Sequence, residues 1–425
     1  MFGAAALVGL ASLGALTGLP RASATAGVAT VITDNGEGNL GLSLTSTPDM
    51  KVKVSWVPPA PVSQIKDWVV HVSTARSLIP DPRTYTAPAN ATSIVIPRAA
   101  QVRVTSGDYT FVKVTVERKS GVTGSSPTKW IKAPVLTAPA SSTKVTLGTF
   151  NVRTWGVESS VSDPRSWMNR RADVVNTIVA SGARVVAIQE ASGSSANTAY
   201  GGISQRADLL RLMRQKRDTW RLADGSHYGP NYLHGRQGNR ILYDSSLFSV
   251  IDHGVMQGTS GTPGAPGWVP WARLKELRSG ASFFVVSVHF EYGKDAPGST
   301  TFYDLRQEQA KATIALIKDK LAVGGVQVFV AGDFNSTSLT LPNNGVHQAF
   351  VKAGFFDAFA TKDVSGATYP TTNSFVFPVR ESPYRRDYIM SYGGPRGSYW
   401  YKNMAYKDDV NTASDHFMQV SQMPF

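Results

Sequence analysis

The stretch VQVFVAGDFN (Val326–Asn335) carries a run of mostly apolar residues directly into Gly-Asp-Phe-Asn. An apolar run of this length, bounded by turn residues, predicts a buried β-strand. Asp333 and Asn335 bring a carboxyl and an amide group to the end of that strand. The stretch therefore predicts a polar site at the edge of a sheet, where α/β enzymes build their sites.

Five other strings place polar residues at the borders of apolar runs between Lys144 and the C-terminus. They are Thr149-Phe150-Asn151, Gln189-Glu190, Ser287-Val288-His289, Arg386-Asp387-Tyr388-Ile389 and Ser414-Asp415-His416. Taken singly, each string has an ordinary structural explanation, such as a solvated turn, a hydrogen-bonded core histidine or a helix cap. Their succession along one stretch indicates a site. Without a site, the ordinary explanations would all have to hold for five strings in a row.

The same part of the chain alternates strand-like and helical patterns. The expected strands are Val145–Val152, Arg184–Glu190, Arg240–Tyr243, Ser282–His289, Val326–Ala331 and Arg386–Ser391, and the expected helices are Ser166–Ser181, Ser204–Lys216 and Tyr303–Leu321. Pro164 before the first helix and Gly182 after it are typical start and stop signals. Mixed strands and helices predict an α/β fold, with layered sheets and helices outside.

From Lys144 to the C-terminus, the ordered strings resemble the endonuclease/exonuclease/phosphatase family. The resemblance implies a catalytic domain over residues 144–425 that forms a four-layer sandwich, in which two mixed β-sheets are flanked by helices. It also implies an enzyme that hydrolyses phosphoric esters with the help of a divalent metal ion.

The resemblance assigns a role to each string by its position. It implies that Glu190 is the principal metal ligand, and that Asn151 and Asp415 complete the metal and water environment. It implies that Asp333 and Asn335 orient the attacking water and contact the phosphate. The remaining implied site residues are the two histidines His289 and His416 and the carboxylate Asp387, which pairs with the last histidine. Outside the resemblance, the residues themselves offer Arg240 and Arg306 as phosphate-binding or structural arginines.

The expected metal ion is a hard cation. The chain has no cysteine, which excludes a thiolate zinc site and leaves oxygen and imidazole ligands. Mg²⁺ prefers one or two carboxylates together with substrate phosphate, and Mn²⁺ or Ca²⁺ can also occupy a site of oxygen ligands. Each histidine has two possible roles, proton transfer or hydrogen bonding to phosphate.

The N-terminal third is expected to contain no chemistry. Residues 1–26 resemble a secretory signal peptide, although no Lys or Arg precedes the apolar run, which leaves open a misassigned start or an uncleaved anchor. Residues 40–135 alternate apolar and polar positions in short runs and resemble a fibronectin type III module, whose ligand could be a cell surface or a polysaccharide. Residues 136–143 are the expected linker. The mature protein is expected to be secreted, without stable membrane insertion.

Charge and one Trp-bearing segment bear on the substrate. The chain holds 43 Lys and Arg against 30 Asp and Glu, a net charge of +13, which favours a polyanionic partner such as nucleic acid. The Gly/Pro-rich segment Gly254–Trp271 is expected to be a loop whose Trp268 and Trp271 stack on bases, enter lipid or pack on the fold. A nuclease is therefore the first hypothesis. A phosphatase or phospholipid phosphodiesterase on the same scaffold is the second, and a non-catalytic surface-binding protein is the third.

Overall fold

The structure is a computed structural model of the 425-residue chain. It describes residues 40–46, 51–58, 62–73, 83–97, 109–121, 123–126, 128–132, 138–141, 143–155, 162–193, 202–223, 238–257, 268–296, 298–337, 340, 344–382, 384–406 and 413–425. The predicted signal peptide, residues 1–26, lies outside the described residues. Among the residues that are described, no helix is both long and apolar enough to cross a membrane.

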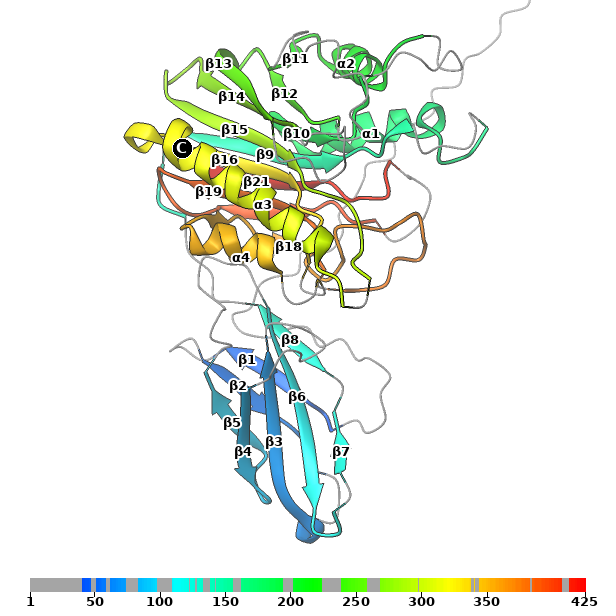
Figure 1. Ribbon diagram of the computed structural model, residues 1–425, viewed down its shortest axis with the longest axis vertical. Helices are drawn as coiled ribbons and strands as arrows, with labels where there is room; N and C mark the ends of the chain where they lie inside the picture. Colours follow the sequence, from blue (N-terminus) through cyan, green and yellow to red (C-terminus); the bar gives the residue numbers. More distant parts are fainter. Residues whose placement is uncertain are drawn as a thin grey trace, which may run out of the picture.

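The N-terminal strands form two antiparallel sheets, drawn at the lower end of Figure 1. One sheet has the order β1-β2-β5 and the other the order β4-β3-β6-β7, with β8 also paired to β6. The strands are β1 (Ser43–Ser46), β2 (Val52–Ser55), β3 (Ile65–Ser73), β4 (Arg83–Pro88), β5 (Ser93–Ile96), β6 (Tyr109–Arg118), β7 (Thr123–Ser125) and β8 (Lys129–Lys132). On β6, Val112, Val114 and Val116 lie in a core shared by both sheets, as alternation in a half-buried strand requires. Trp56 and Trp68 pack in the same core with ring centroids 5.2 Å apart.

The C-terminal part contains two larger mixed sheets. The seven-stranded sheet has the order β11-β12-β10-β9-β21-β20-β18, and the six-stranded sheet has the order β13-β14-β15-β16-β19-β17. The first sheet comprises β9 (Lys144–Asn151), β10 (Val185–Gln189), β11 (Trp220–Leu222), β12 (Arg240–Asp244), β18 (Val364–Ser365), β20 (Trp400–Asn403) and β21 (Gln419–Pro424). The second comprises β13 (Phe248–Gln257), β14 (Trp268–Glu276), β15 (Ser282–His289), β16 (Val328–Asp333), β17 (Phe356–Asp357) and β19 (Asp387–Tyr392).

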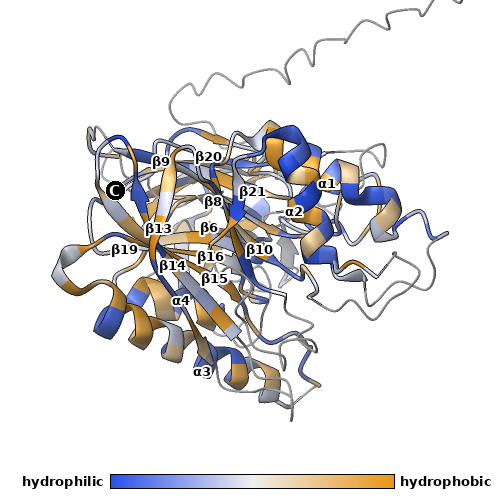
Figure 2. Ribbon diagram, turned by 90° about the horizontal axis from the view of Figure 1, so that it is seen from above, coloured by the Kyte–Doolittle hydropathy of each residue, from blue (hydrophilic) through white to orange (hydrophobic). Residues whose placement is uncertain are grey.

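Within the described part of the chain, four α-helices cover the outer faces of these sheets. They are α1 (Trp167–Ser181), α2 (Gln205–Lys216), α3 (Thr301–Leu316) and α4 (Gly345–Lys352), and a π-helical turn, Ile317–Leu321, continues α3. Figure 2 shows α1 and α2 on one side of the sheets and α3 and α4 on the other, so the order of layers is helix, sheet, sheet, helix.

Strand β10 shows how the sequence produces these layers. Val185 and Ala187 belong to the core between the two sheets, whereas Val186 and Ile188 belong to the core under α1 and α2. A strand buried on both faces is nearly continuously apolar, as this one is from Val185 to Ile188. Full burial of each such Val or Ile contributes roughly 1.5–3 kcal/mol. The strand is therefore stabilised both by packing under α1 and α2 and by packing against the other sheet.

Most of the expected elements are present, with shifts of at most two residues at their ends when the turn Ile317–Leu321 is counted with α3. Helix α1 ends where predicted, since Gly182 adopts a left-handed conformation with a φ of 71°. The expected loop Gly254–Trp271 is wrong at both ends. Trp268 and Trp271 lie in β14, paired with Gln257 and Gly254 of β13, and Trp271 packs on Phe284 with ring centroids 5.8 Å apart.

Candidate active site

Strand register brings the predicted strings together. In the seven-stranded sheet, the parallel pair β9–β10 places Asn151 opposite Gln189, and Glu190 follows directly. In the six-stranded sheet, His289 lies opposite Asp333 across the parallel pair β15–β16, and Asp333 lies opposite Asp387 across β16–β19. The polar strand ends of both sheets thus meet at one edge of the sandwich.

Close approach of β15 and β16 explains the glycine of the Gly-Asp-Phe-Asn string. A Cβ atom at Gly332 would lie 1.9 Å from the carbonyl oxygen of Val288. No side chain fits at that distance, so glycine allows the strands to pair up to His289 and Asp333.

Asn151 joins the two sheets at the site. Its Nδ2 donates to Glu190 Oε1 at 2.8 Å and to Asp333 Oδ2 at 3.3 Å. The second oxygen of Glu190, Oε2, accepts from the backbone N–H of Thr154 at 2.7 Å. One amide therefore holds a carboxylate from each sheet.

Asp333 lies between the two predicted histidines. Its Oδ2 is 3.6 Å from His289 Nε2 and 3.7 Å from His416 Nε2, and its exposed fraction is 2%. Nδ1 of His289 is buried and has no hydrogen-bond partner among the described residues. Both imidazoles thus present a ring nitrogen to the same carboxylate oxygen.

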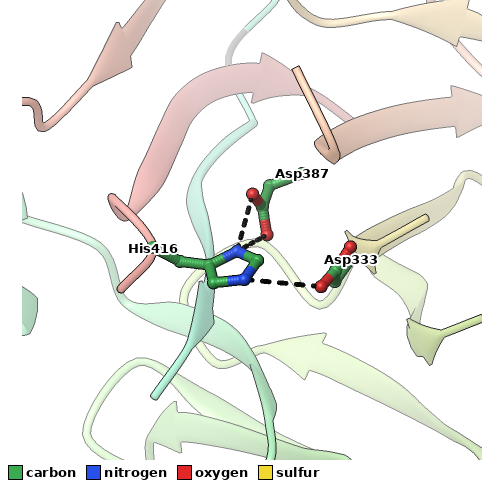
Figure 3. Close-up of side chains that lie close together, drawn as sticks. All are labelled: Asp333, Asp387 and His416. Atoms are coloured by element: carbon green, nitrogen blue, oxygen red, sulfur yellow. Dashed lines mark hydrogen bonds and ion pairs between the residues drawn. The ribbon is translucent and has the colours of Figure 1, made fainter. Parts of the chain in front are cut away.

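His416 and Asp387 form a buried pair, shown with Asp333 in Figure 3. His416 Nδ1 is 3.0 Å from Asp387 Oδ2 and 3.1 Å from Oδ1. Burial alone would lower the pKa of His416, but Asp387 and Asp333 outweigh it and raise the pKa to about 10. The imidazole is accordingly a cation held between two carboxylates, and Asp387 fixes its orientation.

Five described residues at or beside the site have backbone conformations that residues other than glycine rarely adopt. Arg153, Glu190 and Asn335 have φ values of 53°, 64° and 47°, and Ser374 and Phe375 have values of 51° and 55°. Asn335 is held there by Asp333 Oδ1, which accepts its backbone N–H at 2.8 Å, and by the carbonyl of Phe290, which accepts its Nδ2 at 3.0 Å. Such strain concentrates at functional sites, because only a strong structural requirement maintains it.

The comparisons with known proteins show to which family the chain belongs. The family model described as "Endonuclease/Exonuclease/phosphatase family" matches residues 148–416, more than half of the chain. The chain belongs to the endonuclease/exonuclease/phosphatase family. Enzymes of this family are phosphoric ester hydrolases that depend on divalent metal ions, and this chain is such a hydrolase.

A solved structure with a TM-score of 0.50 shows a similar fold. A mannosyl-6-phosphatase from Bacteroides thetaiotaomicron is 18% identical with a TM-score of 0.50, and the match covers 65% of this chain and 98% of that one. An endonuclease/exonuclease/phosphatase family protein from the same organism is 17% identical with a TM-score of 0.49, covering 66% of this chain and 97% of that one. No curated protein matches the sequence.

The donor groups at this family site fit a hard divalent cation. Carboxylate oxygens of Asp333 and Asp387 lie within 4.8 Å of each other and of His416, and the Asn151 amide links Asp333 to Glu190. Because His416 is cationic, the carboxylates and not its imidazole would hold the metal. Carboxylate oxygens dominate the set, as Mg²⁺ and Mn²⁺ prefer. Several carboxylates in one buried site repel one another, and a cation relieves that repulsion.

Asp415 has a different partner from the one expected for a metal ligand. Its Oδ2 is 2.7 Å from Arg153 Nη1, and the Arg153 guanidinium also lies over the Phe375 ring, 5.0 Å from its centroid. The direct effect of Asp415 is to hold this arginine at the site. Its role in the metal environment stays a prediction, and Arg153 is a site residue that the sequence analysis missed.

The two arginines expected at the substrate are both buried. Arg306 Nη1 donates to the carbonyls of Glu291 at 3.3 Å and Gly293 at 3.0 Å, and its Nη2 lies 3.7 Å from Asp295. It therefore braces the loop that follows His289. Arg240 has an exposed fraction of 1% and lies under Gly193, three residues after Glu190. Contact of either residue with substrate stays a prediction.

Proposed function

We propose that this hydrolase is a secreted nuclease that cleaves phosphodiester bonds of DNA or RNA by metal-assisted in-line attack of water. The observation that supports hydrolysis most strongly is the convergence of Glu190, Asp333 and His416 on one buried site from both sheets. The net charge of +13 supports nucleic acid as the substrate, because a phosphate backbone is recognised first by positive charge.

The side chains divide the work according to their positions. A Mg²⁺ ion, or Mn²⁺ or Ca²⁺, held by Glu190 with its neighbours would supply positive charge for the phosphate oxygens. Asp333 is placed to orient water and accept its proton, because its buried carboxylate lies between the Asn151 amide and both histidine rings. His416, kept cationic by Asp387, can donate a hydrogen bond or a proton to an oxygen of the phosphate.

Arg153 adds to the case for an anionic substrate. Its side chain is partly exposed, with an exposed fraction of 26%, and lies between the Asp415 carboxylate and the Phe375 ring. An arginine fixed in this way keeps donors for a phosphate group without losing further conformational entropy.

A phosphatase or phospholipid phosphodiesterase remains the second hypothesis, because the same site chemistry serves phosphate monoesters and head groups. A purely structural, surface-binding role is disfavoured, since Glu190, Asp333 and His416 are all retained and in contact with site partners.

The N-terminal sheets are proposed to be a fibronectin type III-like module. Their division into β1-β2-β5 and β4-β3-β6-β7 around one core supports this proposal. A spacer or adhesive role on a cell surface or polysaccharide fits a protein exported by a signal peptide at residues 1–26.

Removal of divalent metal is expected to abolish nuclease activity. The full chain should clear DNA in a gel with Mg²⁺ present. With EDTA, a dilution series should show activity at least ~100-fold lower, because the phosphate charge is then left uncompensated. Re-addition of Mg²⁺ should restore clearing. Parallel assays on sphingomyelin, inositol phosphates and mannose 6-phosphate separate the alternatives. Hydrolysis of one of these without hydrolysis of DNA or RNA would replace the nuclease proposal.

A further inference from the structure

We propose that Thr371 is a positioning residue of the catalytic site, whose hydroxyl group fixes Asp387 against His416. The inference rests on the proposed function, in which Asp387 and His416 act as a pair. It concerns the segment Thr371–Phe375, which none of the predicted strings includes.

Asp387 and His416 need a third element because they belong to different sheets. Asp387 is the first residue of β19 in the six-stranded sheet, and His416 lies three residues before β21 in the seven-stranded sheet. Packing of sheet on sheet alone would leave their separation sensitive to small sliding motions. Contacts that tie both residues to one segment remove that freedom.

The Thr371 side chain supplies the contact to Asp387. Thr371 has an exposed fraction of 1%, and its Oγ1 accepts from the backbone N–H of Arg386 at 2.9 Å and of Asp387 at 3.2 Å. Burial raises the pKa of Asp387, and the neighbouring Asp333 carboxylate raises it further. His416 and the Thr371 hydroxyl act in the opposite direction, but burial prevails. By accepting two consecutive backbone N–H groups, the hydroxyl fixes the start of β19 and with it the Asp387 carboxyl group that faces His416.

The backbone of the same segment supplies the contacts to His416. Thr372 forms an isolated antiparallel bridge with His416, and the backbone N–H of Phe417 donates to the carbonyl of Thr371 at 2.8 Å. The backbone N–H of Asn373 donates to the carbonyl of Asp415 at 2.8 Å, and its Nδ2 donates to the carbonyl of Ser414 at 3.0 Å. Thr371–Asn373 therefore holds Ser414-Asp415-His416 by its backbone and the Asn373 side chain, and it holds the start of β19 by the Thr371 hydroxyl.

The test compares Thr371→Val, which keeps the shape and removes the hydroxyl, with Thr371→Ser, which keeps the hydroxyl. Hydrolysis of bis(4-nitrophenyl) phosphate by the full chain with Mg²⁺ should show kcat lowered roughly 10- to 100-fold in Thr371→Val, with KM changed less than about 3-fold, because the reacting groups are displaced while binding is kept. Thr371→Ser should stay within about 3-fold of wild type. Thr313→Val is the matched control, since Thr313 is fully buried and its hydroxyl donates to the Gln309 carbonyl within α3.

A second readout does not depend on activity. In protein freed of metal by EDTA, the proton between His416 Nδ1 and Asp387 should give a downfield proton NMR resonance that is absent in His416→Ala. The resonance should persist in Thr371→Ser and shift or disappear in Thr371→Val. If Thr371→Val does not fold, Thr371→Ala is measured with the same expectations.

Wild-type kcat and an unchanged resonance in the hydroxyl-free variant would overturn the inference. Equal losses of kcat in Thr371→Val and Thr313→Val, or in Thr371→Val and Thr371→Ser, would overturn it as well. A wild-type protein without any phosphodiesterase activity would refute the proposed function instead, and the resonance would still decide the role of Thr371.

Discussion

Asp333→Asn is expected to lower kcat at least ~100-fold, equivalent to about 2.7 kcal/mol of transition-state stabilisation. The substitution keeps the size of the side chain and an oxygen that can accept the backbone N–H of Asn335. It removes the negative charge that lies 3.6 Å from His289 Nε2 and 3.7 Å from His416 Nε2. Steady-state hydrolysis of DNA and of bis(4-nitrophenyl) phosphate with Mg²⁺ would measure the effect.

Asp304→Asn is the matched control for this prediction. Asp304 is an exposed carboxylate in the first turn of α3, and its Oδ2 accepts from Thr300 Oγ1 at 2.6 Å. Its loss should leave kcat within about 2-fold, as surface substitutions away from a site usually do. Wild-type turnover in Asp333→Asn would show that this carboxylate takes no part in the reaction.

Asp357→Asn is expected to lower the free energy of unfolding by about 3–5 kcal/mol, because it leaves a buried guanidinium without its counter-charge. Asp357 is fully buried, and its Oδ2 lies 2.6 Å from Arg385 Nη2 and 3.0 Å from His347 Nε2. Its Oδ1 also accepts the backbone N–H of Phe359 at 2.9 Å. Chemical denaturation of wild type and variant at pH 7 would measure the difference, with Asp304→Asn again as the control.

The same carboxylate predicts how stability changes in acid. Burial would raise the pKa of Asp357, but Arg385 and His347 outweigh it and hold the pKa well below its usual range. A lowered pKa in the folded state contributes stability that is complete above the unfolded pKa of about 3.9 and is lost as the pH falls below it. Wild type should therefore lose more stability than Asp357→Asn between pH 5 and the acid limit of folding. Two results would contradict this account of Asp357 and its partners. One is that the stabilities of wild type and Asp357→Asn fall in parallel as the pH is lowered, and the other is that Asp357→Asn lowers the free energy of unfolding at pH 7 by less than about 1 kcal/mol.

The sequence is sufficient to predict the site residues that border strands. His289 and Asp333 stand at the end of an apolar run and Asp387 at the start of one, and parallel or antiparallel pairing of those runs brings the three into register. The fold class follows from the same runs, since apolar strands flanked by helices have few ways to bury both faces.

Residues whose role depends on a distant partner could not be predicted. Arg153 pairs with Asp415 across 262 positions, and Thr371 contacts Asp387 from a segment without regular structure. The Gly- and Pro-rich composition around Trp268 and Trp271 wrongly predicted a loop there. Both tryptophans lie in β14 and pair with β13. Local pattern carries no information on such contacts, because tertiary packing decides them.

The central claim is that side chains from both sheets form one metal-dependent hydrolytic centre. Calorimetric titration of Mg²⁺ and Mn²⁺ into chelator-treated protein tests it most directly, with wild type, Glu190→Gln and Asp304→Asn measured side by side. The account predicts binding by wild type and Asp304→Asn, and affinity at least ~10-fold weaker in Glu190→Gln, because a carboxylate ligand is lost. Equal affinity in all three proteins, or hydrolysis that persists undiminished when no metal binds, would contradict it.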